Sequence, residues 1–112
     1  MKIDMSISGL KQAYSEGSLT PATLLARIRE QAAALADHNI WIHLLSEAEQ
    51  QPYLQALADK DPATTPLWGV PFAIKDNIDL AGIPTTNGCE AFAYTPTQSS
   101  QVVQQLIAAG AL

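Results

Sequence analysis
The stretch "PLWGVPFAIKDNIDLAGIPTTNGC", residues 66–89, decides how this chain is expected to fold. Apolar residues stand at alternate positions from 70 to 74, and this period of two is typical of a strand. Lys75 falls in the other register, on a face lined with small side chains. The alternation resumes over residues 78–80 and ends at Gly82, which predicts two strands joined by a bend or bulge.

A further strand is predicted upstream, at "IWIHLL", residues 40–45. This run of β-branched and aromatic residues is too short for a helix and apolar enough for a buried strand.

Apolar spacing and end signals predict four helices. The first covers residues 6–16 before Gly17, and the second is opened by Thr20 and Pro21. Ser46 and Glu49 match a capping box that opens the third, although Pro52 allows a later start at that residue. The last helix follows a serine cap, at Ser99 or Ser100, and ends at Gly110.

We therefore expect an α/β fold. It comprises a helical lead-in over about residues 1–60, a lysine-bearing strand region over about 66–96 and a helix over about 99–109. The elements alternate without closing a sheet, so they should be part of a larger mixed sheet covered by helices. A helix stopped by "AAG" and followed by "AL" is how an α/β protein enters its next strand. Residues 1–112 are thus expected to be an N-terminal fragment of a single domain, incomplete as it stands.

Composition narrows the class of function. The 112 residues carry six basic and eleven acidic side chains, a formal charge of −5, so the electrostatic attraction that drives nucleic-acid binding is missing. No apolar run is long enough to span a bilayer, and the N-terminus has no signal-peptide core. Cys89 is the single cysteine, and His38 and His43 lack partners at metal-ligand spacing. We expect a soluble, cytoplasmic protein that binds neither membrane, metal nor cofactor.

Two interpretations of Lys75 remain open from the residues alone. In the first, the stem of the lysine lies along a strand end while its ammonium meets water or pairs with Asp76 or Asp79. In the second, the lysine lies in a cleft and acts as a base, since desolvation makes an amine lose its proton more readily. Cys89 has no nearby histidine to activate it and is expected to be a small, partly buried thiol.

The lysine segment closely resembles a known block. "PLWGVPFAIKDNIDLAGIPTTNG" is similar to the first conserved block of the amidase signature family, in which the lysine of GVPxxxKD supplies the base of a Ser-cisSer-Lys triad. The segments "NIWIHLL", "TTNGCEAFAYTP" and "VVQQLIAAGA" are similar to the allophanate hydrolase branch of that family. Together these segments cover most of residues 20–112.

The resemblance implies a catalytic role for Lys75 and a hydroxyl nucleophile elsewhere. In the family, the neutral amine takes a proton through the cis-serine, the second serine attacks the substrate carbonyl, and backbone N–H groups stabilise the oxyanion. The resemblance implies that the glycine- and serine-rich block that carries both serines lies downstream of Leu112. Ser99 and Ser100 lack the glycine setting of that block and are expected to cap a helix instead. The chain alone is therefore predicted to be inactive.

Thr85 and Thr86 are candidates for the wall of the active site. They follow Pro84 in a polar loop near the lysine block. Turn hydrogen bonding by their hydroxyls is the alternative.

The activity implied by the resemblance is hydrolysis of allophanate to ammonia and carbon dioxide in urea degradation. Its implied partners are a urea carboxylase and a second identical subunit. Two alternatives stay open. Another amidase, such as the A subunit of the tRNA-dependent amidotransferase, shares the lysine block, and a non-catalytic fragment could act as an interaction module.

Overall fold

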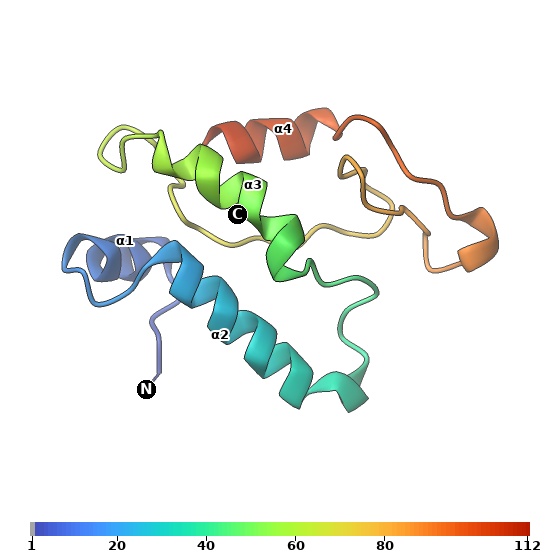
Figure 1. Ribbon diagram of the computed structural model, residues 1–112, viewed down its shortest axis with the longest axis horizontal. Coiled ribbons are helices and arrows are strands. Elements are labelled where there is room, and N and C mark those ends of the chain that lie inside the picture. Colours follow the sequence, from blue (N-terminus) through green and yellow to red (C-terminus); the bar gives the residue numbers. More distant parts are fainter. Residues whose placement is uncertain (1) are drawn as a thin grey trace.

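The structure is a computed structural model that describes residues 2–112. Its helices are α1 (Ile7–Ser15), α2 (Pro21–Ala34), α3 (Glu47–Ala58) and α4 (Gln101–Ala108), with 3-10 turns at Ala36–His38 and Glu90–Phe92. Figure 1 shows α1 and α2 on one side of the molecule and α4 on the other. A long connection over residues 59–100 joins α3 to α4 and carries the lysine segment.

The four helices confirm the predicted positions. The Thr20 side chain accepts a hydrogen bond from the Thr23 amide and caps α2, whose first residue is Pro21. Helix α3 begins at Glu47 with its capping box formed, so the alternative start at Pro52 is wrong. Pro52 lies inside the helix, where its ring nitrogen has no hydrogen to donate.

Helix α4 begins directly after Ser100, as predicted, but no serine side chain caps it. Ser100 is the N-cap residue, yet its side chain makes no capping bond. The Ser99 hydroxyl instead accepts a hydrogen bond from the Ala81 amide at 3.0 Å. The start of α4 is therefore tied to the connection that follows the lysine segment.

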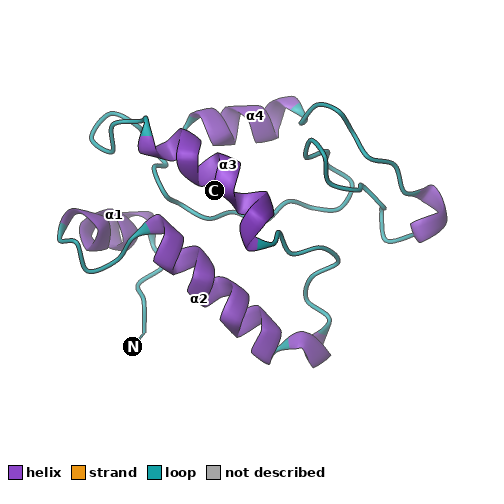
Figure 2. Ribbon diagram, in the orientation of Figure 1, coloured by secondary structure: helices purple, strands orange, loops and turns teal. Residues whose placement is uncertain are grey.

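The predicted α/β fold class is wrong for the part of the chain that the structure describes. Residues 2–112 form no strand, and Figure 2 shows helices joined by loops. A strand needs a neighbour that supplies a row of backbone partners, and an alternating pattern alone does not provide one. Residues 40–45 have no such neighbour, and the side chains of Ile40, Trp41 and Ile42 are 57%, 43% and 67% exposed.

The lysine segment finds only isolated backbone pairs. The Leu112 amide donates to Val70 at 2.8 Å, and the Phe72 amide donates to Leu112 at 2.9 Å. A tight turn follows, in which the Ile78 amide donates to the Lys75 carbonyl at 2.9 Å, but the two strands that the predicted bend was to join are absent from residues 2–112. These contacts fix the segment at both ends without building a ladder.

The core lies between α1, α2 and the residues that join them. Leu10, Leu19 and Leu24 are buried together, and Tyr14 packs against this cluster. The Tyr14 hydroxyl donates to the Gly69 carbonyl at 2.6 Å, and its ring meets Trp68 edge-on at 5.4 Å between centroids. The helical core therefore holds the chain just before the lysine segment.

The capping box of α3 gives a measurable stability difference. Substituting Ser46→Ala removes the acceptor for the Glu49 amide and should lower the free energy of unfolding by about 1 kcal/mol. Urea denaturation measures this as a lower midpoint. Thr97→Ala is the control, because the Thr97 side chain is exposed and makes no hydrogen bond within residues 2–112. Equal midpoints for the two variants would contradict a stabilising cap.

Tyr14 makes the stability sensitive to alkaline pH. Burial raises the pKa of Tyr14 to about 12. The folded chain thus holds this proton more tightly than the unfolded chain, whose tyrosines titrate near pH ~10. The resulting stabilisation is complete below about pH 10 and is lost as the pH rises toward 12. Urea midpoints should therefore fall more steeply over this range in the parent chain than in Tyr14→Phe, with Tyr53→Phe as the control.

Candidate active-site cleft
A cleft of about 640 Å³ runs between the helices and the long connection. Its walls are mostly apolar and come from residues 40–45, residues 71–76 and parts of α2 and α3. Lys75 and Asp76 are the charged residues that the lysine segment contributes to it. An apolar cleft with few polar groups is the usual form of a small-molecule site.

Lys75 is exposed and lies at the end of the fixed segment. Its carbonyl is held by the turn to Ile78, which sets the backbone position from which the side chain extends. No carboxylate of residues 2–112 lies within ion-pair distance of its amine, so of the two options in the first interpretation the amine faces water and does not pair with Asp76 or Asp79. The amine is therefore neither enclosed nor paired within this part of the protein.

Asp76 points its carboxylate at the loop that follows. One oxygen accepts the Thr86 amide at 2.9 Å, and the other accepts the Thr86 hydroxyl and the Gly88 amide, the latter at 3.0 Å. The Asn87 amide also donates to the Asp76 carbonyl at 2.9 Å. Hydrogen bonds from the Thr86 hydroxyl, the Gly88 amide and the Thr86 amide, in that order, lower the pKa of Asp76. This carboxylate is an anchor for residues 86–88.

Asp79 forms a second anchor next to the first. Its Oδ1 accepts hydrogen bonds from the Thr85 hydroxyl at 2.9 Å and from the Tyr94 hydroxyl at 2.6 Å. The bond to Asp79 raises the pKa of Tyr94, because the phenol must keep its proton to donate it. Thr85 is 2% exposed, and its backbone pairs with Tyr94 in an isolated bridge.

The two threonines predicted as wall residues lie in different places. Thr85 lines the main cleft, whereas Thr86 lines a smaller cavity of about 400 Å³ beside it. Both hydroxyls donate to aspartates of residues 76–79, so they take part in the loop hydrogen bonding that was the alternative. Their contact with a substrate stays a prediction.

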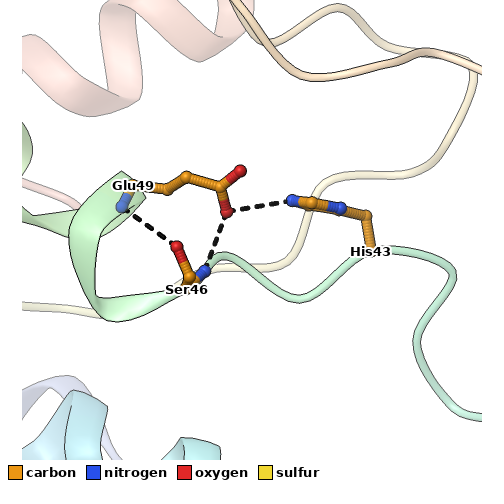
Figure 3. A network of polar contacts seen from close by, with 3 residues as sticks. All are labelled: His43, Ser46 and Glu49. Atoms are coloured by element: carbon orange, nitrogen blue, oxygen red, sulfur yellow. Dashed lines mark hydrogen bonds and ion pairs between the residues drawn. The ribbon is translucent and has the colours of Figure 1, made fainter.

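His43 connects the open loop over residues 40–45 to α3. Its Nε2 lies 3.1 Å from Glu49 Oε2, which also accepts the Ser46 amide at 2.8 Å, and Figure 3 shows this network. The Ser46 amide is the main cause of the lowered pKa of Glu49, and His43 contributes less. His43 lines both cavities, so this network holds one wall of the site.

The side chains of Cys89 and Ser100 take no part in these networks. Cys89 is exposed, so the predicted partial burial of its thiol is wrong. The Ser100 hydroxyl is buried and has no hydrogen-bond partner among the described residues. Across residues 2–112, no three His, Cys, Asp or Glu side chains are grouped to hold a metal ion. The helices of the same range are all too short or too polar to cross a membrane.

Sequence reasoning missed the anchoring role of the two aspartates. It treated Asp76 and Asp79 only as ion-pair partners for Lys75. The signal was the polar turn "TTNG", residues 85–88, whose amides and hydroxyls need acceptors close by in the chain.

Comparison with known proteins gives consistent matches. Residues 22–112 match the family described as Amidase. The urea amidolyase of Saccharomyces cerevisiae is 40% identical over 103 residues, which are 91% of this chain and 5% of that protein. The A subunit of the glutamyl-tRNA(Gln) amidotransferase of Deinococcus radiodurans is 35% identical over 104 residues, 92% of this chain and 22% of that protein.

A solved structure agrees with the fold. A variant of the Kluyveromyces lactis allophanate hydrolase superposes with a TM-score of 0.79 at 32% identity. The match covers 96% of this chain and 18% of that one. The chain therefore spans less than a quarter of the length of each of these three proteins.

Proposed function
The chain belongs to the amidase family, and from that premise we propose that it forms the lysine-bearing part of the active site of an amide hydrolase. In this proposal residues 1–112 are the N-terminal part of a single amidase domain. The rest of that domain supplies the hydroxyl nucleophile and the oxyanion hole. The proposal places the protein in the cytoplasm.

The proposed role of Lys75 is that of the base. Its neutral amine accepts the proton of a serine hydroxyl as that oxygen attacks the amide carbonyl, and the proton later leaves with the amine of the product. The observation that carries this role is the position of Lys75 on an apolar cleft while its acidic neighbour, Asp76, is engaged with Thr86 and Gly88. A carboxylate held away from the amine does not stabilise its charged form.

The proposal makes a physical demand on the rest of the domain. An amine is neutral near pH 7 only when it is desolvated or lies near other cations. Lys75 is exposed within residues 2–112, so further protein must cover the cleft before the lysine can act as a base. The exposed side chains of Ile40, Trp41 and Ile42 beside the cleft would be buried by the same cover.

The substrate we propose is allophanate, hydrolysed to ammonia and carbon dioxide. The support is the similarity to a urea amidolyase and to an allophanate hydrolase structure over most of this chain. We propose a urea carboxylase as the functional partner, and the proposed structural partner is a second identical subunit. The second candidate is an amidotransferase A subunit, favoured by the 35% identity to the Deinococcus radiodurans protein.

One comparison tests the proposal. Ammonia release is measured from allophanate, from glutamine and from simple amides, with residues 1–112 and with the polypeptide that the whole gene encodes. We expect no turnover by residues 1–112 and hydrolysis of allophanate by the whole gene product. Preference for glutamine would favour the amidotransferase candidate. If neither polypeptide hydrolyses any amide, the hydrolase proposal fails and an interaction module is the better reading.

A further inference from the structure
We propose that Asp76 is a positioning residue that holds residues 86–88 as a wall beside the Lys75 cleft. We call the hydrogen bonds from residues 86–88 to Asp76 the clamp. The clamp is present in the described chain, whereas its role in catalysis rests on the proposed function. Asp76 neither gives nor takes a proton in it.

The donors converge on Asp76 from a single short turn. Two backbone amides and one hydroxyl of residues 86–88 meet its two carboxylate oxygens, and a third amide meets its carbonyl. Asn87 and Gly88 both have positive φ, at 49° and 70°, a curvature that turns successive amides toward one point. Charge-assisted hydrogen bonds are the stronger kind, so the carboxylate is the natural centre of this turn.

The position of the clamp gives it a role in the site. Asp76 directly follows Lys75 and lines the main cleft, while Thr86 and Gly88 line the smaller cavity together with His43. The bond network thus fixes the distance between the lysine segment and the wall of the smaller cavity. The two cavities share His43 and Pro84, so the place of this wall beside the Lys75 cleft depends on Asp76.

Two substitutions that nearly preserve side-chain size test the clamp, one at Asp76 and one at Thr86. Asp76→Asn keeps one acceptor oxygen but turns an NH₂ group toward the Gly88 amide, which is itself a donor. Thr86→Val removes only the hydroxyl at nearly constant volume. The control is Asp59→Asn, which removes the same charge from an exposed residue whose side chain makes no hydrogen bond within residues 2–112.

Amide hydrogen exchange by NMR on residues 1–112 tests the clamp without any activity. We expect the Gly88 amide, which loses its acceptor, to exchange about 10-fold faster in Asp76→Asn. The Thr86 amide keeps a neutral acceptor and should exchange faster by a smaller factor, and both amides should be unchanged in Asp59→Asn. Thr86→Val should speed exchange at Gly88 by a smaller factor. Unchanged exchange rates in both Asp76→Asn and Thr86→Val would show that Asp76 does not hold residues 86–88, and this conclusion would not depend on any measurement of activity.

Kinetics of the whole gene product test its role in the site. We expect Asp76→Asn to raise the KM for the amide about 10-fold, with kcat nearly constant and its pH profile unmoved, and Asp76→Glu to restore part of the loss. A displaced pH profile, or a fall in kcat at constant KM, would instead place Asp76 in the proton chemistry and overturn its positioning role. If the gene product hydrolyses no amide, the proposed function fails while the exchange result still decides the clamp.

Discussion

Lys75→Ala is expected to lower amide hydrolysis by the whole gene product by at least about 100-fold in kcat, because loss of a general base typically costs a factor of 10² to 10⁴. The alanine variant keeps the backbone turn to Ile78, so the lysine segment should retain its position. Lys75→Arg should be nearly as inactive, since a guanidinium does not give up its proton at neutral pH. Ammonia release at saturating substrate measures the effect.

The control for this loss is Lys11→Ala. Lys11 lies in α1, is exposed and makes no hydrogen bond through its side chain within the described range. Its variant should keep the activity of the parent, and both variants should show the same far-ultraviolet circular dichroism. Full activity in a folded Lys75→Ala protein would show that Lys75 is not the general base. The proposed catalytic role of residues 66–89 would then fail.

Gly110→Ala is expected to destabilise the chain by about 2–4 kcal/mol. Gly110 has a φ of +96°, and a β-carbon there would lie 2.6 Å from Thr65 Cγ2 and 2.8 Å from Trp68 Cα. The backbone cannot move aside freely, because the Gly69 amide donates to the Gly110 carbonyl at 2.9 Å. Urea denaturation should show a much lower midpoint.

Gly82→Ala is the control that separates the cost of a positive φ from the cost of a steric clash. Gly82 has a similar φ of +77°, but no atom lies within 4 Å of the position that a β-carbon would take. This variant should therefore show only the conformational cost of a left-handed residue, about 1–2 kcal/mol. A Gly110→Ala protein no less stable than Gly82→Ala would mean that the contact between the end of α4 and residues 65–69 is loose.

The helices could be predicted because their signals are local. Thr20, Ser46 and Glu49 act on amides three residues away, so sequence spacing alone contains the geometry of these caps. The strands could not be settled in this way. The alternation over residues 70–74 indicates which side chains would share a face of a strand. A sheet also needs a neighbouring strand, and the described residues offer only single backbone pairs there.

The family of the lysine segment could be predicted from the sequence, but the contacts of that segment could not, and the catalytic role of Lys75 stays a prediction. The resemblance of residues 66–88 to the amidase block drew attention to Lys75, and the family match agrees with that resemblance. The use of Asp76 and Asp79 as acceptors depends on how residues 84–94 fold back, a path set by positive-φ residues and by pairing of Thr85 with Tyr94. Sequence spacing does not specify such a path.

The contrast between the two tryptophans has an optical consequence. Trp68 is half-buried, with its indole N–H donating to the Leu57 carbonyl at 3.1 Å, whereas Trp41 stands open beside the cleft. Indole fluorescence responds to the water around the ring, so the two residues report on different events. A polypeptide that seals the cleft would shift the emission of Trp41 to shorter wavelength while leaving Trp68 as an internal reference, so closure of the proposed active site could be followed without substrate or label.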